Sequence, residues 1–202
     1  MTAAALPLPL AVLAERRHGV FSTGEALDVG LDSYELTRLV RRGICERLRR
    51  GWYVDAARYR AADDIGRHLL RARAVTAAMT TPHVLSHASA AAAHGLPLYE
   101  IALDEVHLTH PLSARATRHE ANVWHHCGDL DALEIMTVDG LGVTALARTA
   151  FDVARACDPA GALVVADAAL ARGATLADYR AVLEHRADWP GSVKASHVLT
   201  RA

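Results

Sequence analysis

Nine residues between positions 33 and 50 combine arginine with hydroxyl side chains. They are Ser33, Tyr34, Thr37, Arg38, Arg41, Arg42, Arg47, Arg49 and Arg50. Arginine makes bidentate hydrogen bonds to guanine and to phosphate, and hydroxyl groups reach base edges and phosphate oxygens. The first four lie at the N-terminal end of a predicted helix, the end from which a recognition helix reads bases in the major groove. The other five are arginines placed to neutralise phosphates, so double-stranded DNA is the predicted partner.

The net charge of the whole chain hides this basic segment. The 202 residues contain 22 Lys and Arg against 23 Asp and Glu, which gives a net charge of −1. Residues 33–60 contain eight arginines and three acidic residues, a local charge of +5. Such an asymmetry along a chain indicates a nucleic-acid partner. A second interpretation stays open, because the same arginines could form the solvated face of a module that binds another protein.

Three helices are predicted in this part of the chain, and the third carries the first of these side chains. Residues 9–17 predict a helix, a short second helix ends near Gly30, and Asp32 caps a third helix over residues 33–42. The third helix ends at Gly43, and its apolar and basic residues fall on opposite faces.

After the third helix, the spacing of apolar residues changes from that of a helix to that of a strand. Residues 44–54 alternate in polarity around a turn at Arg50 and Gly51, which predicts a β-hairpin with a basic tip. We expect Trp52 and Tyr53 to anchor this hairpin on the helices rather than to stack on bases. Three helices followed by a basic hairpin are typical of a winged helix-turn-helix.

The rest of the chain predicts a mixed α+β domain with a small sheet and C-terminal helices. Strands are predicted at residues 83–85, 105–109, 121–126, 133–138 and 141–143. Helices, with their caps, are predicted at residues 65–80, 88–94, 144–156, 158–172, 175–185 and 192–202. The overall fold class is therefore α+β. A change of composition over residues 55–64 predicts two domains, residues 1–60 and 61–202.

Twelve histidines raise the possibility of a metal site. His87 and His94 lie seven residues apart, which is too far for one ion unless the fold supplies further ligands. His125 and His126 are adjacent and point to opposite sides of a predicted strand. The sequence has no HExxH, HxH or cysteine-pair motif. We therefore expect no metal ion, and histidines that form hydrogen bonds within the fold.

The motifs of common enzymes are also missing from the sequence. It contains no GxSxG elbow, no GxGxxG after a strand and no Walker loop. Asp152 and Asp167 are isolated carboxylates in apolar helices, and helical spacing makes Arg148 and Arg155 the expected partners of Asp152. We expect no enzyme activity and no cofactor.

Cysteine usage and the N-terminus predict a cytoplasmic protein with no membrane partner. Cys45, Cys127 and Cys157 lie far apart, which suits neither a disulfide framework nor a metal motif. The apolar stretch at residues 3–14 is short, contains two prolines and has no basic residue before it, unlike a signal peptide or a membrane span. Hydrophobic residues make up 51% of the chain, enough for a buried core.

Several segments, taken in order, resemble one known family. Residues 19–27 (GVFSTGEAL), 40–44 (VRRGI) and 48–54 (LRRGWYV) resemble the winged-helix domain of AbiEi-family antitoxins. The remainder is similar to the region that follows this domain in actinobacterial members. Its landmarks are residues 85–97 (LSHASAAAAHGLP), 105–109 (EVHLT), 143–155 (VTALARTAFDVAR) and 164–170 (VVADAAL).

The resemblance implies a type IV toxin–antitoxin system. In such a system the antitoxin opposes a nucleotidyltransferase-like toxin, by contact or indirectly, and represses its own operon through the winged helix. The resemblance gives the role of DNA contact to Thr37, Arg38, Arg41, Arg42, Arg47, Arg49 and Arg50.

One departure from the family concerns the C-terminus. Many similar chains continue into a restriction-endonuclease-like domain from about where this one ends, at residues 194–202. The length leaves no room for that domain, so we expect a stand-alone regulator or a truncated or split relative. The alternatives are a protein-interaction module and a remnant of a nuclease-bearing protein without catalytic activity.

Overall fold

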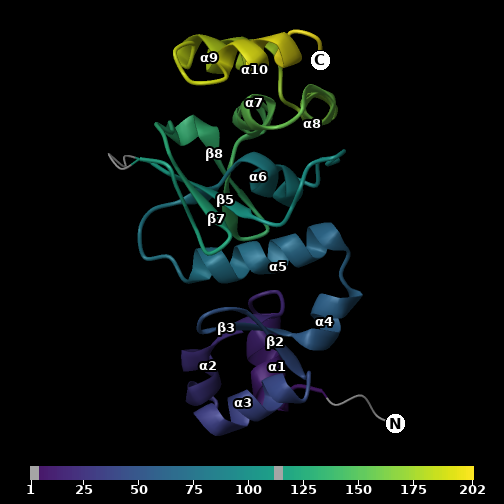
Figure 1. Ribbon diagram of the computed structural model, residues 1–202, viewed down its shortest axis with the longest axis vertical. Helices are drawn as coiled ribbons and strands as arrows, with labels where there is room; N and C mark the ends of the chain where they lie inside the picture. The colour runs from purple at the N-terminus through teal and green to yellow at the C-terminus, as the bar shows by residue number, and fades with distance from the viewer. Residues whose placement is uncertain (1–4, 112–115) are drawn as a thin grey trace. The chain divides into compact units, whose positions relative to one another are not determined.

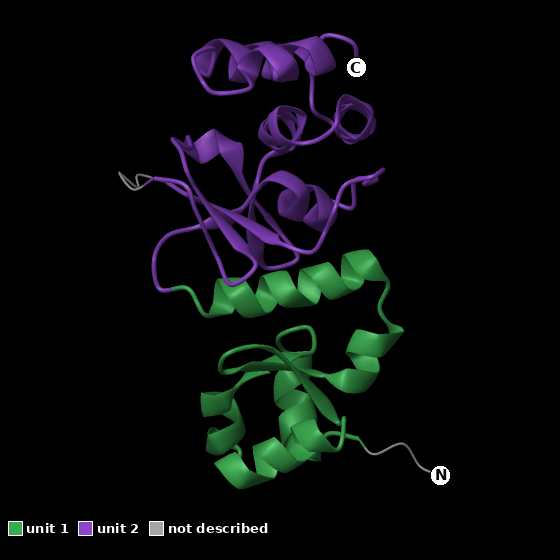
Figure 2. Ribbon diagram, in the orientation of Figure 1, with its two compact units in different colours: residues 1–79 green, residues 80–202 purple. Residues whose placement is uncertain are grey.

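The computed structural model describes residues 5–111 and 116–202, and the chain divides into two compact units, residues 1–79 and 80–202 (Figure 2). Unit 1 contains the predicted winged helix, and unit 2 contains the predicted mixed α+β fold. The sequence-based boundary lies at residues 60 and 61. Residues 64–77 form a helix that packs on the strands of unit 1, so the division into compact units comes later in the chain.

Unit 1 consists of short helices around a three-stranded sheet. Its elements are α1 (Leu8–Glu15), β1 (Val20–Ser22), α2 (Thr23–Asp28), α3 (Ser33–Arg41), β2 (Cys45–Arg49), β3 (Trp52–Asp55), α4 (Ala56–Ala61) and α5 (Asp64–Ala77) (Figure 1). The strands are antiparallel in the order β1-β3-β2. Three helices followed by the β2–β3 hairpin confirm the predicted winged-helix arrangement.

Apolar side chains from all three helices fix this arrangement. Leu10 of α1, Ala26 of α2 and Leu36 and Leu39 of α3 are buried in one cluster with Phe21 of β1. Leu70 of α5 is buried in a second cluster, with side chains of β1 and β3. The helices are therefore held to the sheet by burial of apolar surface, which is the main favourable term in folding.

The sequence pattern does not predict two elements of unit 1. Strand β1 has three residues and runs directly into the N-cap of α2 at Ser22, so no alternating pattern marks it. It forms because Val20 pairs with Val54 of β3, along the edge of β3 that does not pair with β2. Helix α4 has six residues and begins at Ala56, immediately after β3, with Asp55 as its N-cap.

Unit 2 is built on a six-stranded mixed sheet. Its strands are β4 (Val84–Leu85), β5 (Val106–His110), β6 (Arg118–Glu120), β7 (Val123–Cys127), β8 (Ile135–Val138) and β9 (Leu141–Thr144). Their order is β6-β7-β5-β4-β9-β8. The β5–β7 and β4–β9 pairs are parallel and the others are antiparallel. Strand β6 was not predicted, because it is short and all three of its residues are exposed.

The helices of unit 2 form layers against one face of this sheet. They are α6 (His87–Ala93), α7 (Leu146–Ala156), α8 (Pro159–Ala171), α9 (Leu176–His185) and α10 (Ser192–Leu199), with a short 3-10 turn at Ala132–Glu134. In Figure 1, α6 lies on the sheet, α7 and α8 lie beyond it, and α9 and α10 are outermost. Phe151, Tyr179 and Leu199 are fully buried where these helices meet. Within the described part of the chain, no helix is both long and apolar enough to cross a membrane.

Candidate nucleic-acid interface

Helix α3 is fixed at its start and along its inner face. The carboxylate of Asp32 accepts a hydrogen bond from the Glu35 amide at 2.7 Å, and the Glu35 side chain accepts one from the Asp32 amide at 2.9 Å. This capping box satisfies two amides that the helix itself cannot. Leu36 and Leu39 are buried against the core of unit 1. The remaining face of α3 is therefore held outward.

The predicted contact residues of α3 lie on that outward face. Ser33, Tyr34, Thr37, Arg38, Arg41 and Arg42 are all exposed, and Tyr34 is 72% exposed. Thr37 Oγ1 donates to the Ser33 carbonyl at 2.8 Å, so this hydroxyl can still accept a hydrogen bond from outside. The three arginines form no ion pair with any described residue. The face thus presents free cationic and hydroxyl groups along one helix.

The hairpin carries the other three predicted contacts. Its turn lies at Gly51, where φ is +76° and glycine avoids the strain of a side chain. Arg47 and Arg50 are exposed, and Arg47 Nε donates to the Arg49 carbonyl at 3.3 Å. Arg49 is half-buried, and its Nη1 is buried without a hydrogen-bond partner among the described residues. A β-bulge between Arg47 and Arg49 puts Leu48 out of register with β3.

The aromatic residues after the turn anchor the hairpin, as predicted. Tyr53 stacks on Phe21 of β1 with ring centroids 5.7 Å apart. Arg17 lies 5.7 Å from the centre of the Trp52 ring and forms an ion pair with Glu25 at 2.7 Å. Both rings are therefore occupied by contacts within unit 1.

Two further arginines of the basic segment serve the fold. Arg58 pairs with Glu15 at 2.8 Å. Arg60 donates to the carbonyls of Ala56 at 2.9 Å and Gly43 at 3.0 Å. Both arginines contribute to the local charge of +5. Without them, the six arginines on α3, at its C-cap and on the hairpin remain for an outside partner. Nothing in their local sequence separates the two groups, because Glu15 is 43 positions from Arg58.

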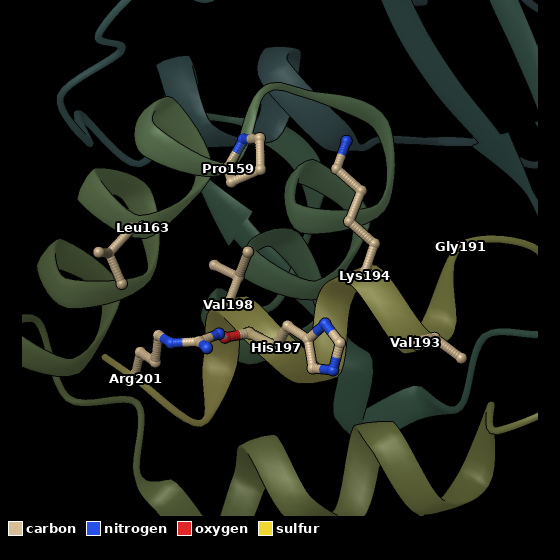
Figure 3. Close-up of a pocket in the computed structure, with 8 residues that line it drawn as sticks. All are labelled: Pro159, Leu163, Gly191, Val193, Lys194, His197, Val198 and Arg201. Atoms are coloured by element: carbon tan, nitrogen blue, oxygen red, sulfur yellow. The ribbon is translucent and has the colours of Figure 1, made fainter.

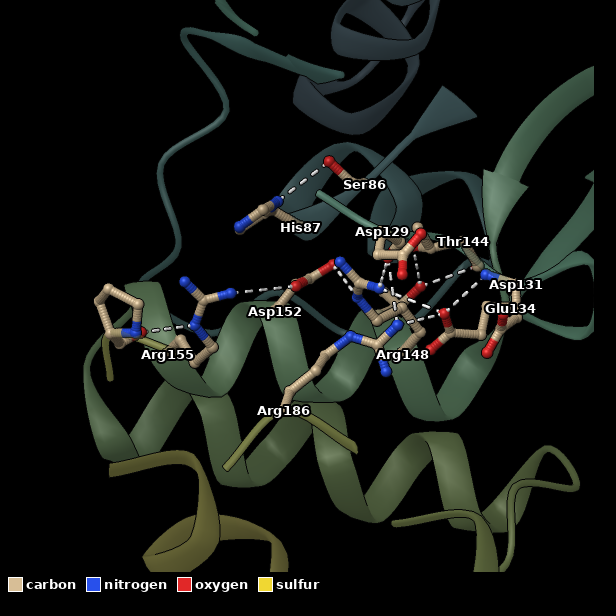
Figure 4. Close-up of polar contacts among 12 residues, drawn as sticks. Ser86, His87, Asp129, Asp131, Glu134, Thr144, Arg148, Asp152, Arg155 and Arg186 are labelled. Atoms are coloured by element: carbon tan, nitrogen blue, oxygen red, sulfur yellow. Dashed lines mark hydrogen bonds and ion pairs between the residues drawn. The ribbon is translucent and has the colours of Figure 1, made fainter. Parts of the chain in front are cut away.

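Unit 2 holds a buried network of charges. The predicted partners of Asp152 are confirmed: Arg148 Nε lies 3.0 Å from its Oδ2, and Arg155 Nη1 lies 3.7 Å from its Oδ1 (Figure 4). Arg148 and Arg186 both contact Glu134, and their guanidinium groups face Trp189 at 4.9 and 5.2 Å. The network therefore consists of three arginines and two carboxylates, and its ion pairs hold elements of unit 2 together in the interior.

An apolar groove lies over α8 and α10. It has a volume of ≈ 620 Å³ and is lined by Leu163, Val193 and Val198, with Lys194 and Arg201 among its polar neighbours (Figure 3). Its polar lining side chains are cationic or imidazole groups, those of Lys194, His197 and Arg201.

Hydrogen-bonded histidines are confirmed at several positions. His94 Nε2 donates to the Thr144 carbonyl at 2.8 Å, and His110 Nε2 lies 2.9 Å from His125 Nδ1. Burial lowers the pKa of both His94 and His110, so each is neutral at physiological pH. These three histidines are occupied by contacts within unit 2.

Comparison with known proteins bears on both units. Residues 10–54 match the family model described as "Transcriptional regulator, AbiEi antitoxin". The crystal structure of the RV2827C protein from Mycobacterium tuberculosis is similar in fold, with a TM-score of 0.58. It is 15% identical in sequence and the match covers 96% of this chain and 75% of that chain, so the likeness concerns the fold alone. A search of curated proteins found no match.

The family match spans the elements that carry the predicted DNA contacts. It runs from the first helix through α3 to the end of the β2–β3 hairpin. The capping box of α3, its outward face and the basic hairpin all lie within the match. Residues 10–54 of this chain are therefore similar to the AbiEi antitoxin family of transcriptional regulators.

Proposed function

We propose that the chain represses its own operon by binding the operator through unit 1, and that it thereby opposes a nucleotidyltransferase-like toxin in the cytoplasm. The observation that carries this proposal is the outward face of α3, whose three arginines have no ion-pair partner among the described residues. A cationic face held rigidly by a buried leucine pair and a capping box is suited to a polyanion of fixed shape.

The roles proposed for the side chains follow from their places on α3 and the hairpin. Ser33, Tyr34, Thr37 and Arg38 occupy the N-terminal half and centre of the helix and would meet base edges. Arg41, Arg42, Arg47, Arg49 and Arg50 would meet phosphates. Each neutralised phosphate contributes about −0.9 to the slope of log affinity against log salt, so five give a slope of about −4.5 for one protomer.

The experiment is fluorescence anisotropy with the DNA upstream of the gene, at low and high salt. We expect salt-dependent binding by the wild type and a large loss in the double variant Arg38→Ala with Arg49→Ala. Arg180→Ala, which removes an exposed charge from α9, is the matched control and should bind like the wild type. The absence of binding at low salt, or equal binding by the double variant, would defeat the proposal.

A second candidate function is a protein-interaction module, and one feature of unit 2 favours it. Strand β8 is the last strand of its sheet, and Ile135, Met136 and the neighbouring Leu133 are exposed there. Exposed apolar side chains at a sheet edge suit pairing with another chain. Copurification of the neighbouring toxin with the wild type, lost in Met136→Glu, would support direct contact. DNA binding without copurification would favour indirect opposition.

A further inference from the structure

Three histidines that are distant in the sequence converge on one face of the sheet in unit 2. They are His87 at the start of α6, His107 on β5 and His126 on β7. One ring nitrogen of each lies within 4.8 Å of those of the other two. We propose that His87, His107 and His126 bind one transition-metal ion of the zinc class. The sequence predicts no metal ion because His87 and His94 cannot share one without further ligands, and the fold supplies such ligands to His87 from β5 and β7.

The strand register explains the convergence. In the parallel β5–β7 pair, Thr109 lies opposite His126, and His107 is two residues before Thr109 on the same face. His107 Nδ1 is 3.0 Å from His126 Nε2. Two nitrogens that bind one tetrahedral zinc ion at 2.0–2.1 Å lie about 3.3 Å apart. This pair therefore stands close to the separation that a shared ion requires.

The third ligand comes from a residue in an unusual backbone conformation. His87 has φ +51°, a left-handed conformation that residues with a side chain seldom adopt outside functional sites. Its ring stacks on that of His126 with centroids 4.0 Å apart, so ion binding requires the His87 ring to turn its nitrogen toward the other two. His87 Nδ1 is already 3.0 Å from Ser86 Oγ, which leaves Nε2 as the ligand atom (Figure 4). A hydrogen bond to the second ring nitrogen is the usual support of a metal-binding histidine.

The cavity beside the cluster supplies space and acceptors for a fourth ligand. It has a volume of ≈ 280 Å³ and is lined by His87, His126, Thr109 and Asp152. Thr109 Oγ1 and Asp152 Oδ1 are buried and have no hydrogen-bond partner among the described residues, and the ion pair of Asp152 Oδ1 with Arg155 is long, at 3.7 Å. Both are acceptors that a metal-bound water would satisfy.

The charges around the cavity limit the affinity and the choice of ion. Asp152 compensates part of a divalent charge, whereas Arg155 and Arg148 oppose it. Imidazole ligands select zinc, copper, nickel and iron over magnesium and calcium. Burial also lowers the pKa of His87 and His126, which keeps their rings in the neutral form that binds metal.

The test is a titration of the tag-free full chain with Zn²⁺ in competition with a chromophoric chelator. We expect one ion per chain in the wild type. His107→Gln and His126→Gln each remove a proposed ligand and should lower the affinity by more than about 100-fold. Ser86→Ala removes only the hydrogen bond to the His87 ring and should lower the affinity by roughly 10–100-fold. His197→Gln, an exposed histidine on α10, is the control and should bind like the wild type.

A second measurement does not depend on the folding of any variant. Zn²⁺ added to the wild type should shift the imidazole nitrogen resonances of three of the twelve histidines and raise the melting temperature. The proposal is overturned if the wild type binds no Zn²⁺, if folded His107→Gln and His126→Gln bind it as tightly as the wild type, or if the shifted resonances belong to other histidines.

Discussion

At the scale of single residues, the surroundings of each arginine decide what it does. Arg38 and Arg42 are exposed and form no ion pair with a described residue, so their charge is available to an outside partner. The Arg148 side chain is 1% exposed and is held by Asp152 and Glu134. Its charge is neutralised by these two carboxylates within the fold. Arginines of unit 1 are therefore tested by DNA binding, and those of the unit 2 network by protein stability.

The two exposed arginines should have separable effects on DNA binding. We propose that Arg38 contacts base edges, so Arg38→Ala should cost about 1–3 kcal/mol of binding free energy and reduce discrimination between operator and unrelated DNA. We propose that Arg42 contacts phosphates, so Arg42→Ala should weaken binding to both kinds of DNA equally and reduce the salt slope by about 1. Anisotropy with both DNAs over a range of salt measures both quantities. Identical effects of the two variants would contradict these assignments.

The buried carboxylate at Asp152 should matter for stability far more than the other isolated carboxylate. Asp152→Ala leaves the buried Arg148 guanidinium without its closest carboxylate, and breaking a buried pair in this way costs about 3–5 kcal/mol. Asp167 is exposed, and its replacement by alanine should change stability by about 0.5 kcal/mol or less. Urea unfolding of both variants measures the difference. Equal stabilities would show that the Arg148 charge is solvated or otherwise compensated.

At the scale of elements, His94 joins three parts of unit 2. It caps the end of α6 and donates to the Thr144 carbonyl at the end of β9. Arg172, the C-cap of α8, donates to the His94 carbonyl at 2.7 Å. A change of charge on His94 therefore acts on the packing of two helices and a strand.

The pH dependence of this junction has a definite sign. Burial lowers the pKa of His94 below 6.5, so below pH 6.5 the unfolded chain takes up a proton that the folded chain does not. The free energy of unfolding therefore falls as the pH falls from 6.5 toward the pKa of the folded state. His94→Gln retains a donor for the Thr144 carbonyl without the titration, so its stability should fall less steeply. Urea unfolding above and below pH 6.5 tests this, and parallel curves for the two proteins would refute it.

The sequence predicts the helices and strands whose caps and apolar patterns lie within a few consecutive residues. The caps and apolar faces of α2 and α3 lie within a few residues, so both helices and the outward face of α3 could be predicted. Strand β1 could not, since it exists through pairing with β3 more than thirty positions away. The convergence of His87, His107 and His126 is equally invisible in the sequence, because it depends on the β5–β7 pairing and on where α6 crosses it.

At the scale of the whole molecule, the place of α5 decides where unit 1 ends. Leu70 of α5 is buried with Val20 of β1 and Val54 of β3. Removal of α5 would expose the outer side of the β1–β3 pair, and each buried valine or leucine contributes roughly 1.5–3 kcal/mol by its burial. A small domain of this size has little stability to lose.

Two fragments therefore give a final prediction. Residues 1–79 should fold cooperatively and bind the operator with the same salt slope as the full chain, because every proposed DNA contact lies in unit 1. Residues 1–60, which end at the sequence-based boundary, should lose the cooperative melt. Circular dichroism and anisotropy measure the two properties. If residues 1–60 fold and bind like residues 1–79, then α5 is dispensable to the winged helix and the boundary lies at residues 60 and 61. If residues 1–79 fold but bind with a smaller slope, unit 2 supplies phosphate contacts that α3 and the hairpin do not.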